Sequence, residues 1–171
     1  MFWGSNKVES VEFAKFLIAR AASVSEDEVW GKNVSLGITK LHKLLYICDG
    51  LLLALGFNLI DETPRAWNYG PVYPKIHTWV KNNPNVFTEK QECKPQALQK
   101  LEEINAQSLV DFVLKHYGTW AASSLSLWSH NPGGPWEFAL ERSGGVMNCA
   151  ISKTDMKAYF QHYLKDEKDR N

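Results

Sequence analysis

The apolar repeat over residues 39–56 is the feature that most constrains how this chain can fold. Apolar side chains recur there at steps of three and four, the spacing of one face of an α-helix. Thr39 is a candidate N-cap residue, and Gly56 stands where a left-handed residue would end the helix. We therefore expect a central helix over about residues 40–55, covered on more than one side. Its predicted buried stripe consists of Leu41, Leu44, Leu45, Cys48, Leu51, Leu52 and Leu55.

The segment that follows the helix has a different character. Residues 66–74 read AWNYGPVYP, which is rich in aromatic residues and proline and therefore favours a rigid, shaped loop over a helix. Residues 57–67 read as a short pair of extended pieces with a turn at 61–64. We expect a small β-hairpin around residues 59–68.

The junction of Gly70 and Pro71 requires backbone freedom at the glycine. On that basis we expect Trp67 and Tyr69 to pack inward and Tyr73 to face out. A loop whose prolines restrict it loses little conformational entropy on binding, so it is a candidate docking surface. The alternative is that the loop only clamps the central helix to the next helix.

Apolar repeats on both sides of the central helix predict further helices. Thr119 is a candidate cap, and residues 152–155 resemble a capping box with aspartate in the acidic position. The charged tail 165–171 is expected to fray. Together these patterns predict one mainly α-helical domain over residues 1–171, a single compact helical domain with a small β-hairpin and a core of about 11–163. The further helices are expected at 11–22, from 74 to near 84, 96–117 with a break near 105–108, 119–130, 135–140 and after 152.

Charge and hydropathy narrow the class of protein. Hydrophobic residues make up 44% of the 171 residues, which is typical of a globular chain. Nineteen basic and nineteen acidic residues give no net charge, so nucleic acid is not expected as the main ligand. The longest apolar run, residues 51–55, is far shorter than the roughly 20 residues of a membrane-spanning helix. The N-terminal residues lack the pattern of a signal peptide, so we expect a cytoplasmic protein without a membrane partner.

The sequence contains no recognisable catalytic or metal-binding motif. Cys48, Cys93 and Cys149 lack metal-ligand spacing, and HExxH, GxSxG, paired CxxC and phosphate-binding glycine loops are absent. Cys48 belongs to the apolar stripe, where a thiol is usually inert packing. We therefore expect no catalytic residue, no metal and no cofactor, although an enzyme with an unrecognised site stays open.

Two sets of residues, in order along the chain, resemble the Panacea domain, a bacterial and phage-associated family of SocA-like antitoxins. The resemblance runs from about Val11 to about Phe160. His42 stands where a glutamine is usual, and Ser129 stands where a threonine is usual before the histidine. The matching residues are 40–46, Ala66, Trp67, 69–72 and Pro74, followed by Tyr117, Gly118, Leu125, Ser129, His130, Pro135 and Trp136.

The resemblance implies an antitoxin that neutralises a separately encoded, cognate toxin protein by direct contact. A second function that it implies is an adaptor that delivers its partner to a protease. A nucleic-acid-binding regulator and an enzyme are the alternatives from other classes. Tryptophan and tyrosine are enriched at interaction hot spots, and seven tryptophans and six tyrosines favour a binding module over an enzyme.

The candidate partner-binding residues are aromatic or lie beside aromatic residues. His130 precedes Pro135 and Trp136, so it could present a polar group beside an aromatic surface. The favoured alternative is that His130 bonds to backbone at a helix end while Trp136 fills the core. The full candidate set is Trp67, Tyr69, Pro71, Tyr73, His130 and Trp136.

Overall fold

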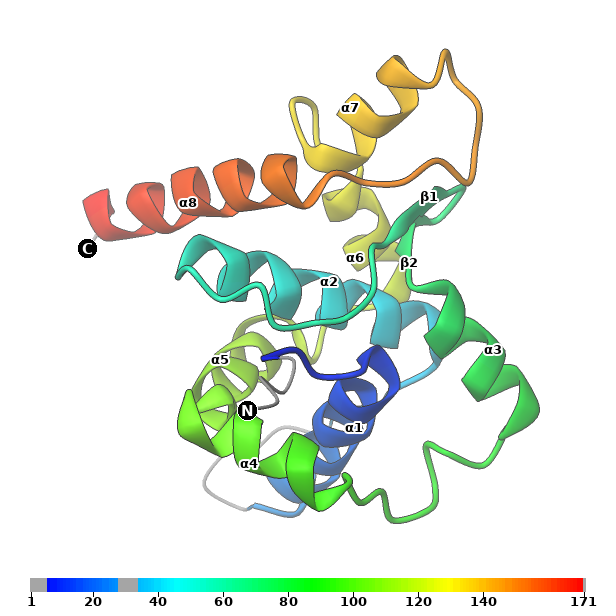
Figure 1. Cartoon of the computed structure of the whole chain (residues 1–171), viewed down its shortest axis with the longest axis vertical. Helices are drawn as coiled ribbons and strands as arrows, with labels where there is room; N and C mark the ends of the chain where they lie inside the picture. The colour runs from blue at the N-terminus through cyan, green and yellow to red at the C-terminus, as the bar shows by residue number, and fades with distance from the viewer. Residues whose placement is uncertain (1–5, 28–33, 171) are drawn as a thin grey trace, which may run out of the picture.

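A computed structural model describes residues 6–27 and 34–170 of the protein. The described residues form eight α-helices and one two-stranded antiparallel sheet, which confirms the mainly α fold with a small hairpin (Figure 1). The tryptophans at positions 3 and 30 lie outside the described residues. The elements are α1 Ser10–Glu26, α2 Ile38–Ala54, β1 Arg65–Trp67, β2 Gly70–Val72, α3 Pro74–Asn82, α4 Pro95–Glu103, α5 Ala106–Tyr117, α6 Ala122–Ser129, α7 Pro135–Arg142 and α8 Lys153–Asp169.

Helix α2 is the centre of the fold, as its apolar repeat predicts. It packs against α8, α6, α5, α1 and β2, and Figure 1 shows α8 lying along it. The predicted stripe is buried except for Leu55, which is 58% exposed because the helix has already ended at Ala54. Gly56 has the expected left-handed φ of 95°, whereas the N-cap is Gly37 and not Thr39.

The close approach of α8 to α2 depends on a glycine. A Cβ atom at Gly50 would lie 2.1 Å from ring carbons of Phe160, so a side chain at this position would push α8 away. Phe160 is fully buried and packs edge-on against Tyr46 of α2, with the ring centroids 5.5 Å apart. Aromatic packing of this kind adds to the free energy gained from burying the two rings.

The hairpin exists, but the predicted placement at 59–68 was wrong. Trp67 pairs with Gly70, so the turn is Asn68–Tyr69 and residues 61–64 precede the first strand. The free edge of β1 is covered by a segment distant in sequence: Ala66 donates from its N–H to the Cys149 carbonyl at 2.9 Å. Turn residues alone could not place the hairpin, because this second partner of β1 arrives more than eighty residues later.

The predicted orientation of the two tyrosines was also wrong. Tyr73 is fully buried, and Tyr69 is 73% exposed. Tyr73 points inward because its hydroxyl donates to a buried carboxylate of α2, at 2.8 Å from Asp49 Oδ2. Tyr69 stands in the tight turn, where the left-handed Gly70, with φ of 104°, leaves it facing solvent.

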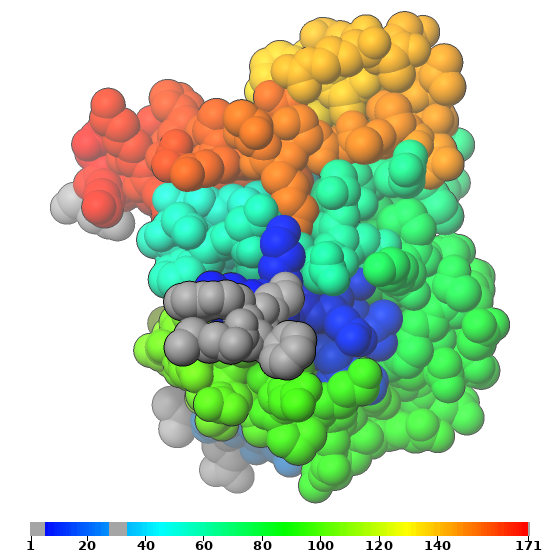
Figure 2. Space-filling model, in the orientation of Figure 1, coloured from blue at the N-terminus to red at the C-terminus, as the bar shows by residue number. Residues whose placement is uncertain are grey.

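The second half of the chain matches the prediction with two exceptions. The break in 96–117 lies at Asn105, which has a left-handed φ of 52°, and Ser152 caps α8 as expected. However, α6 begins at Ala122, so Thr119 is not its cap, and α8 continues helically to Asp169 instead of fraying from residue 165. In Figure 2 the segment around α7 stands above the body of the molecule.

Candidate functional site

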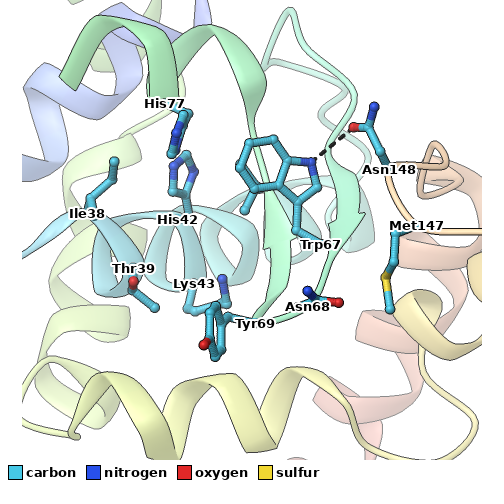
Figure 3. A pocket seen from close by; sticks show the side chains of 11 residues that line it. Ile38, Thr39, His42, Lys43, Trp67, Asn68, Tyr69, His77, Met147 and Asn148 are labelled. Carbon is cyan, nitrogen blue, oxygen red and sulfur yellow. Dashed lines mark hydrogen bonds between the residues drawn. The ribbon is translucent and has the colours of Figure 1, made fainter. Parts of the chain in front are cut away.

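An open pocket of about 520 Å³ lies beside the hairpin turn and is here called the main pocket. It lies between the start of α2, the hairpin turn and the start of α3, and a loop before α8 closes its far side (Figure 3). Most of its wall is apolar or aromatic. The lining residues are Ile38, Thr39, His42, Lys43, Trp67, Asn68, Tyr69, Val72, His77, Met147 and Asn148.

His42 contributes a buried imidazole from the first turns of α2. Its Nδ1 accepts the backbone N–H of Tyr73 at 3.2 Å, so in the neutral ring the proton is on Nε2. Burial, and then the charges of Lys43 and His77, lower the His42 pKa to about 3, which keeps the ring neutral at physiological pH. The Nε2 atom is buried and has no hydrogen-bond partner among the described residues.

Lys43 follows directly and is 1% exposed. Its Nζ donates to the Pro71 carbonyl at 3.0 Å, which ties α2 to β2. Burial lowers the Lys43 pKa to about 8, so most of the ammonium remains protonated at neutral pH. The lysine stem needs the glycine of the turn, because a Cβ at Gly70 would lie 2.7 Å from Lys43 Cε.

Trp67 forms the opposite wall and is held by three neighbours. Its indole Nε1 donates to Asn148 Oδ1 at 3.0 Å, as the dashed line in Figure 3 shows. Its ring meets His77 edge-on with centroids 4.9 Å apart, and its carbonyl accepts Trp136 Nε1 at 2.9 Å. Asn148 has a left-handed φ of 63°, a conformation that asparagine tolerates better than most residues.

A second pocket of about 500 Å³ lies on the other side of Tyr69. Tyr69 and Thr39 line both pockets, so the exposed tyrosine stands between them. Leu127 adds an apolar side chain that is 72% exposed. The two pockets and Tyr69 are together called the docking face below. The second pocket is lined by Thr39, Tyr69, Ser123, Ser126, Leu127 and His130.

His130 and Trp136 take neither of the two predicted arrangements in full. Their rings lie against each other with centroids 3.9 Å apart, and Trp136 is only half-buried. The favoured prediction, a side-chain bond from His130 to backbone, was wrong: its Nε2 is buried without a partner among the described residues. Trp136 supports the hairpin, because its indole N–H donates to the Trp67 carbonyl, and His130 packs against the Trp136 ring.

The structure brings four of the six candidate residues together. Trp67, Tyr69, His130 and Trp136 lie at or directly behind the docking face. Pro71 and Tyr73 are buried and serve the interior.

Sequence reasoning missed Lys43, His77 and Asn148 as parts of this site. The lysine had a visible signal, because it stands between Leu41 and Leu44 of the predicted buried stripe, where a charge is unusual. The other two had none, because His77 and Asn148 come from separate elements and meet Trp67 only in the folded chain.

Behind the hairpin, Asp49 forms a second polar centre that has no exposure to solvent. Tyr73 donates to its Oδ2, and Lys153 Nζ lies 3.5 Å from the same oxygen. Burial raises the Asp49 pKa to about 6, while Lys153 and the Tyr73 hydroxyl oppose that rise. This centre joins α2, α3 and α8 and belongs to the frame that holds the docking face.

Two of the three thiols, those of Cys48 and Cys93, have surroundings that disfavour a reactive thiolate. Cys48 is fully buried, and burial raises the pKa of its thiol further from neutrality. Burial also raises the Cys93 pKa, to about 11. The described residues contain no cluster of histidine, cysteine and acidic side chains suited to a metal ion. Within residues 6–27 and 34–170, no helix is long and apolar enough to cross a membrane.

The chain belongs to a family of antitoxin-like proteins. The family model described as "Antitoxin SocA-like, Panacea domain" matches residues 41–137, which run from the central helix through Trp136. The chain is also similar to Antitoxin SocA of Caulobacter vibrioides (strain NA1000 / CB15N), with 29% identity over 146 residues, covering 80% of this chain and 78% of that protein. No solved structure matches. These findings confirm the family to which the sequence motifs point.

Proposed function

We propose that this protein is an antitoxin that neutralises a separately encoded toxin by direct protein contact, through the docking face. Membership of the SocA-like family across residues 41–137 is the observation that carries the proposal. Most of the docking face lies within the matched segment; the exceptions are Ile38 and Thr39 at the start of α2 and the loop at 147–148. Binding, with no bond made or broken by this chain, is the mode of action.

The surface chemistry of the docking face supports a protein ligand. Tyr69 and Leu127 are exposed side by side with two open pockets, and exposed apolar groups rimmed by polar residues mark interaction sites. Tyrosine is among the residue types most enriched at hot spots. The hairpin beneath is fixed by Lys43, Trp136 and Asn148, so little order has to be gained on binding.

The test is co-expression with the product of a neighbouring reading frame that arrests growth. We expect wild-type protein to restore growth and to form a complex with that product on size-exclusion chromatography. Growth arrest that the wild-type protein does not relieve, for every neighbouring toxic frame, would contradict the proposal.

The toxin's half-life in the same cells separates sequestration from delivery to a protease. Sequestration predicts an inactive toxin that persists at an unchanged level in the complex. A toxin level that falls only when this protein is present, and recovers when the major cytosolic proteases are deleted, would identify an adaptor instead.

A further inference from the structure

Lys43 is a buried cation for which the described residues supply no counter-anion. Its ammonium has three protons, and the Pro71 carbonyl is the one acceptor that the described residues supply. Lys153, the comparable half-buried lysine, pairs with Asp49 at 3.5 Å. Burying an ammonium without an anion costs free energy, because the charge loses its hydration. A buried ammonium beside an open pocket therefore indicates that the anion is supplied by a ligand.

The walls around Lys43 carry no negative charge. No aspartate or glutamate lines either pocket of the docking face. Burial first, and then the charge of Lys43, lowers the pKa of both His42 and His130, so the positive potential reaches both pockets. The buried Nε2–H of His42 in the same wall is a second donor to which the described part of the chain offers no partner.

The other residues of the main pocket determine which kind of chemical group can carry the anion. Trp67, Val72, Ile38 and Met147 form a largely apolar wall, which would bury a hydrocarbon or aromatic group beside the charge. Tyr69 separates this pocket from the second one, so a ligand that fills both must pass over the tyrosine. An extended peptide segment has that shape.

We propose that Lys43 receives the side-chain carboxylate of an aspartate or glutamate on the toxin, within a segment whose neighbouring apolar side chain lies against Trp67. This inference rests on the proposed antitoxin function and names the chemistry of the partner's segment. An internal segment crosses the docking face from the main pocket to the second pocket, with Tyr69 beneath it. The acidic residue supplies the counter-anion that Lys43 lacks.

The carboxylate site can be tested on the purified protein without the toxin. The probes are 3-phenylpropionate and its neutral isostere 3-phenylpropanamide, and the readout is the Trp67 indole N–H resonance, assigned with Trp67→Phe. On wild-type protein we expect the carboxylate to bind about tenfold or more tightly than the amide, since a charge-assisted bond adds about 1.4 kcal/mol or more. Equal affinities for the two probes would overturn the proposal.

Lys43→Met keeps an unbranched side chain, shorter by one atom, and removes the charge. We expect it to abolish the preference for the carboxylate, whereas Lys115→Met, at an exposed lysine of α5, keeps it. A folded Lys43→Met protein that still preferred the carboxylate would also overturn the proposal. The comparison of the two probes on wild-type protein stands even if the variant proves unstable.

A second experiment tests the same inference with variants of the toxin. Each aspartate and glutamate of the toxin is changed to its amide, and affinity is measured against wild-type protein and Lys43→Met. We expect one toxin substitution to weaken binding to wild type about tenfold and to have no effect on Lys43→Met, as a coupled pair requires. If every toxin substitution acts equally on both proteins, the inference is wrong while neutralisation stands. A wild-type protein that prefers the carboxylate probe but binds no toxin would contradict the antitoxin function, and with it the toxin as the source of the carboxylate.

Discussion

Tyr69 and Tyr73 are the same residue type, four positions apart on one hairpin, yet they belong to different regions of the molecule. Tyr69 stands in the turn, 73% exposed, between two open pockets. Tyr73 is fully buried and donates to Asp49 in the interior. The hairpin therefore has a solvent side, which carries Tyr69, and an interior side that attaches it to α2.

The difference shows how a small hairpin can be held in a fixed position on the surface of the protein. A two-stranded hairpin is marginally stable by itself in water. Here three hydrogen bonds on the interior side supply the missing stability. Lys43 donates to the Pro71 carbonyl, the Tyr73 backbone N–H donates to His42, and the Tyr73 hydroxyl donates to Asp49. We expect substitutions on the interior side to change folding and substitutions on the solvent side to change binding.

The largest effect is expected from Tyr73→Ala. Removing a fully buried aromatic side chain costs about 3–5 kcal/mol, because a cavity remains and Asp49 loses a donor. Urea unfolding followed by circular dichroism measures this loss. Tyr73→Phe is the matched control, since it keeps the ring and should cost about 1–3 kcal/mol for the lost donor. A Tyr73→Ala protein as stable as wild type would remove the distinction between the two tyrosines.

The pH dependence of stability tests the same interior centre. The folded pKa of Asp49, about 6, exceeds its ordinary value of 3.8, so the folded state holds this proton more tightly than the unfolded state does. The free energy of unfolding therefore falls as pH rises from about 4 to about 6, by about 2–3 kcal/mol for this group.

Other carboxylates titrate in that range, so Asp49→Asn is the reference. Wild type should lose free energy of unfolding relative to Asp49→Asn as the pH rises from about 4 to about 6. Urea titrations at pH 4, 5, 6 and 7 measure it. If the free energy of unfolding depended on pH in the same way in both proteins, Asp49 would not titrate with a raised pKa.

Tyr69→Ala is expected to leave stability almost unchanged and to weaken binding, whereas Tyr73→Ala is expected to lower stability. The side chain is 73% exposed, so the free energy of unfolding should change by no more than about 0.5 kcal/mol. Affinity for the toxin should fall by about 2 kcal/mol, which is about thirtyfold, if Tyr69 is a hot spot. Calorimetric titration and thermal melting of the same preparation give both numbers.

Phe57→Ala is the control for exposed aromatic area away from the docking face. Phe57 is 41% exposed beyond the C-terminal end of α2, whereas the docking face lies at the N-terminal end. Toxin affinity should be unchanged in this variant. Equal losses from Phe57→Ala and Tyr69→Ala would place the toxin elsewhere on the surface.

The smallest effect is expected from replacing Cys48, Cys93 and Cys149 with alanine together. Burial raises the pKa of the Cys48 and Cys93 thiols, so neither supplies a thiolate at neutral pH. Neutralisation of the toxin should match wild type once any loss of stability is allowed for. A stable triple variant without neutralising activity would instead indicate thiol chemistry and revive the enzyme alternative.

Much of the fold could be predicted because its signals are local. The steps of three and four in 41–52 define the buried face of α2, Gly56 marks its end and Ser152 marks the start of α8. The hairpin was misplaced because its position depends on a partner at 148–151, which no turn signal near residue 65 encodes. Within the aromatic segment the predicted orientations of the two tyrosines were exchanged, because Tyr73 is buried and Tyr69 is exposed.

The sequence by itself determined a helical protein of the SocA-like family organised around residues 40–55, since helical periodicity and family motifs are both properties of short segments. Only the tertiary structure decided that Tyr69 faces solvent, that Tyr73 meets Asp49, and that Lys43 is buried with no counter-anion from residues 6–27 and 34–170. These features depend on contacts between elements separated by twenty or more residues. Burial and electrostatic environment are set by such contacts, so they appear only when the chain is folded.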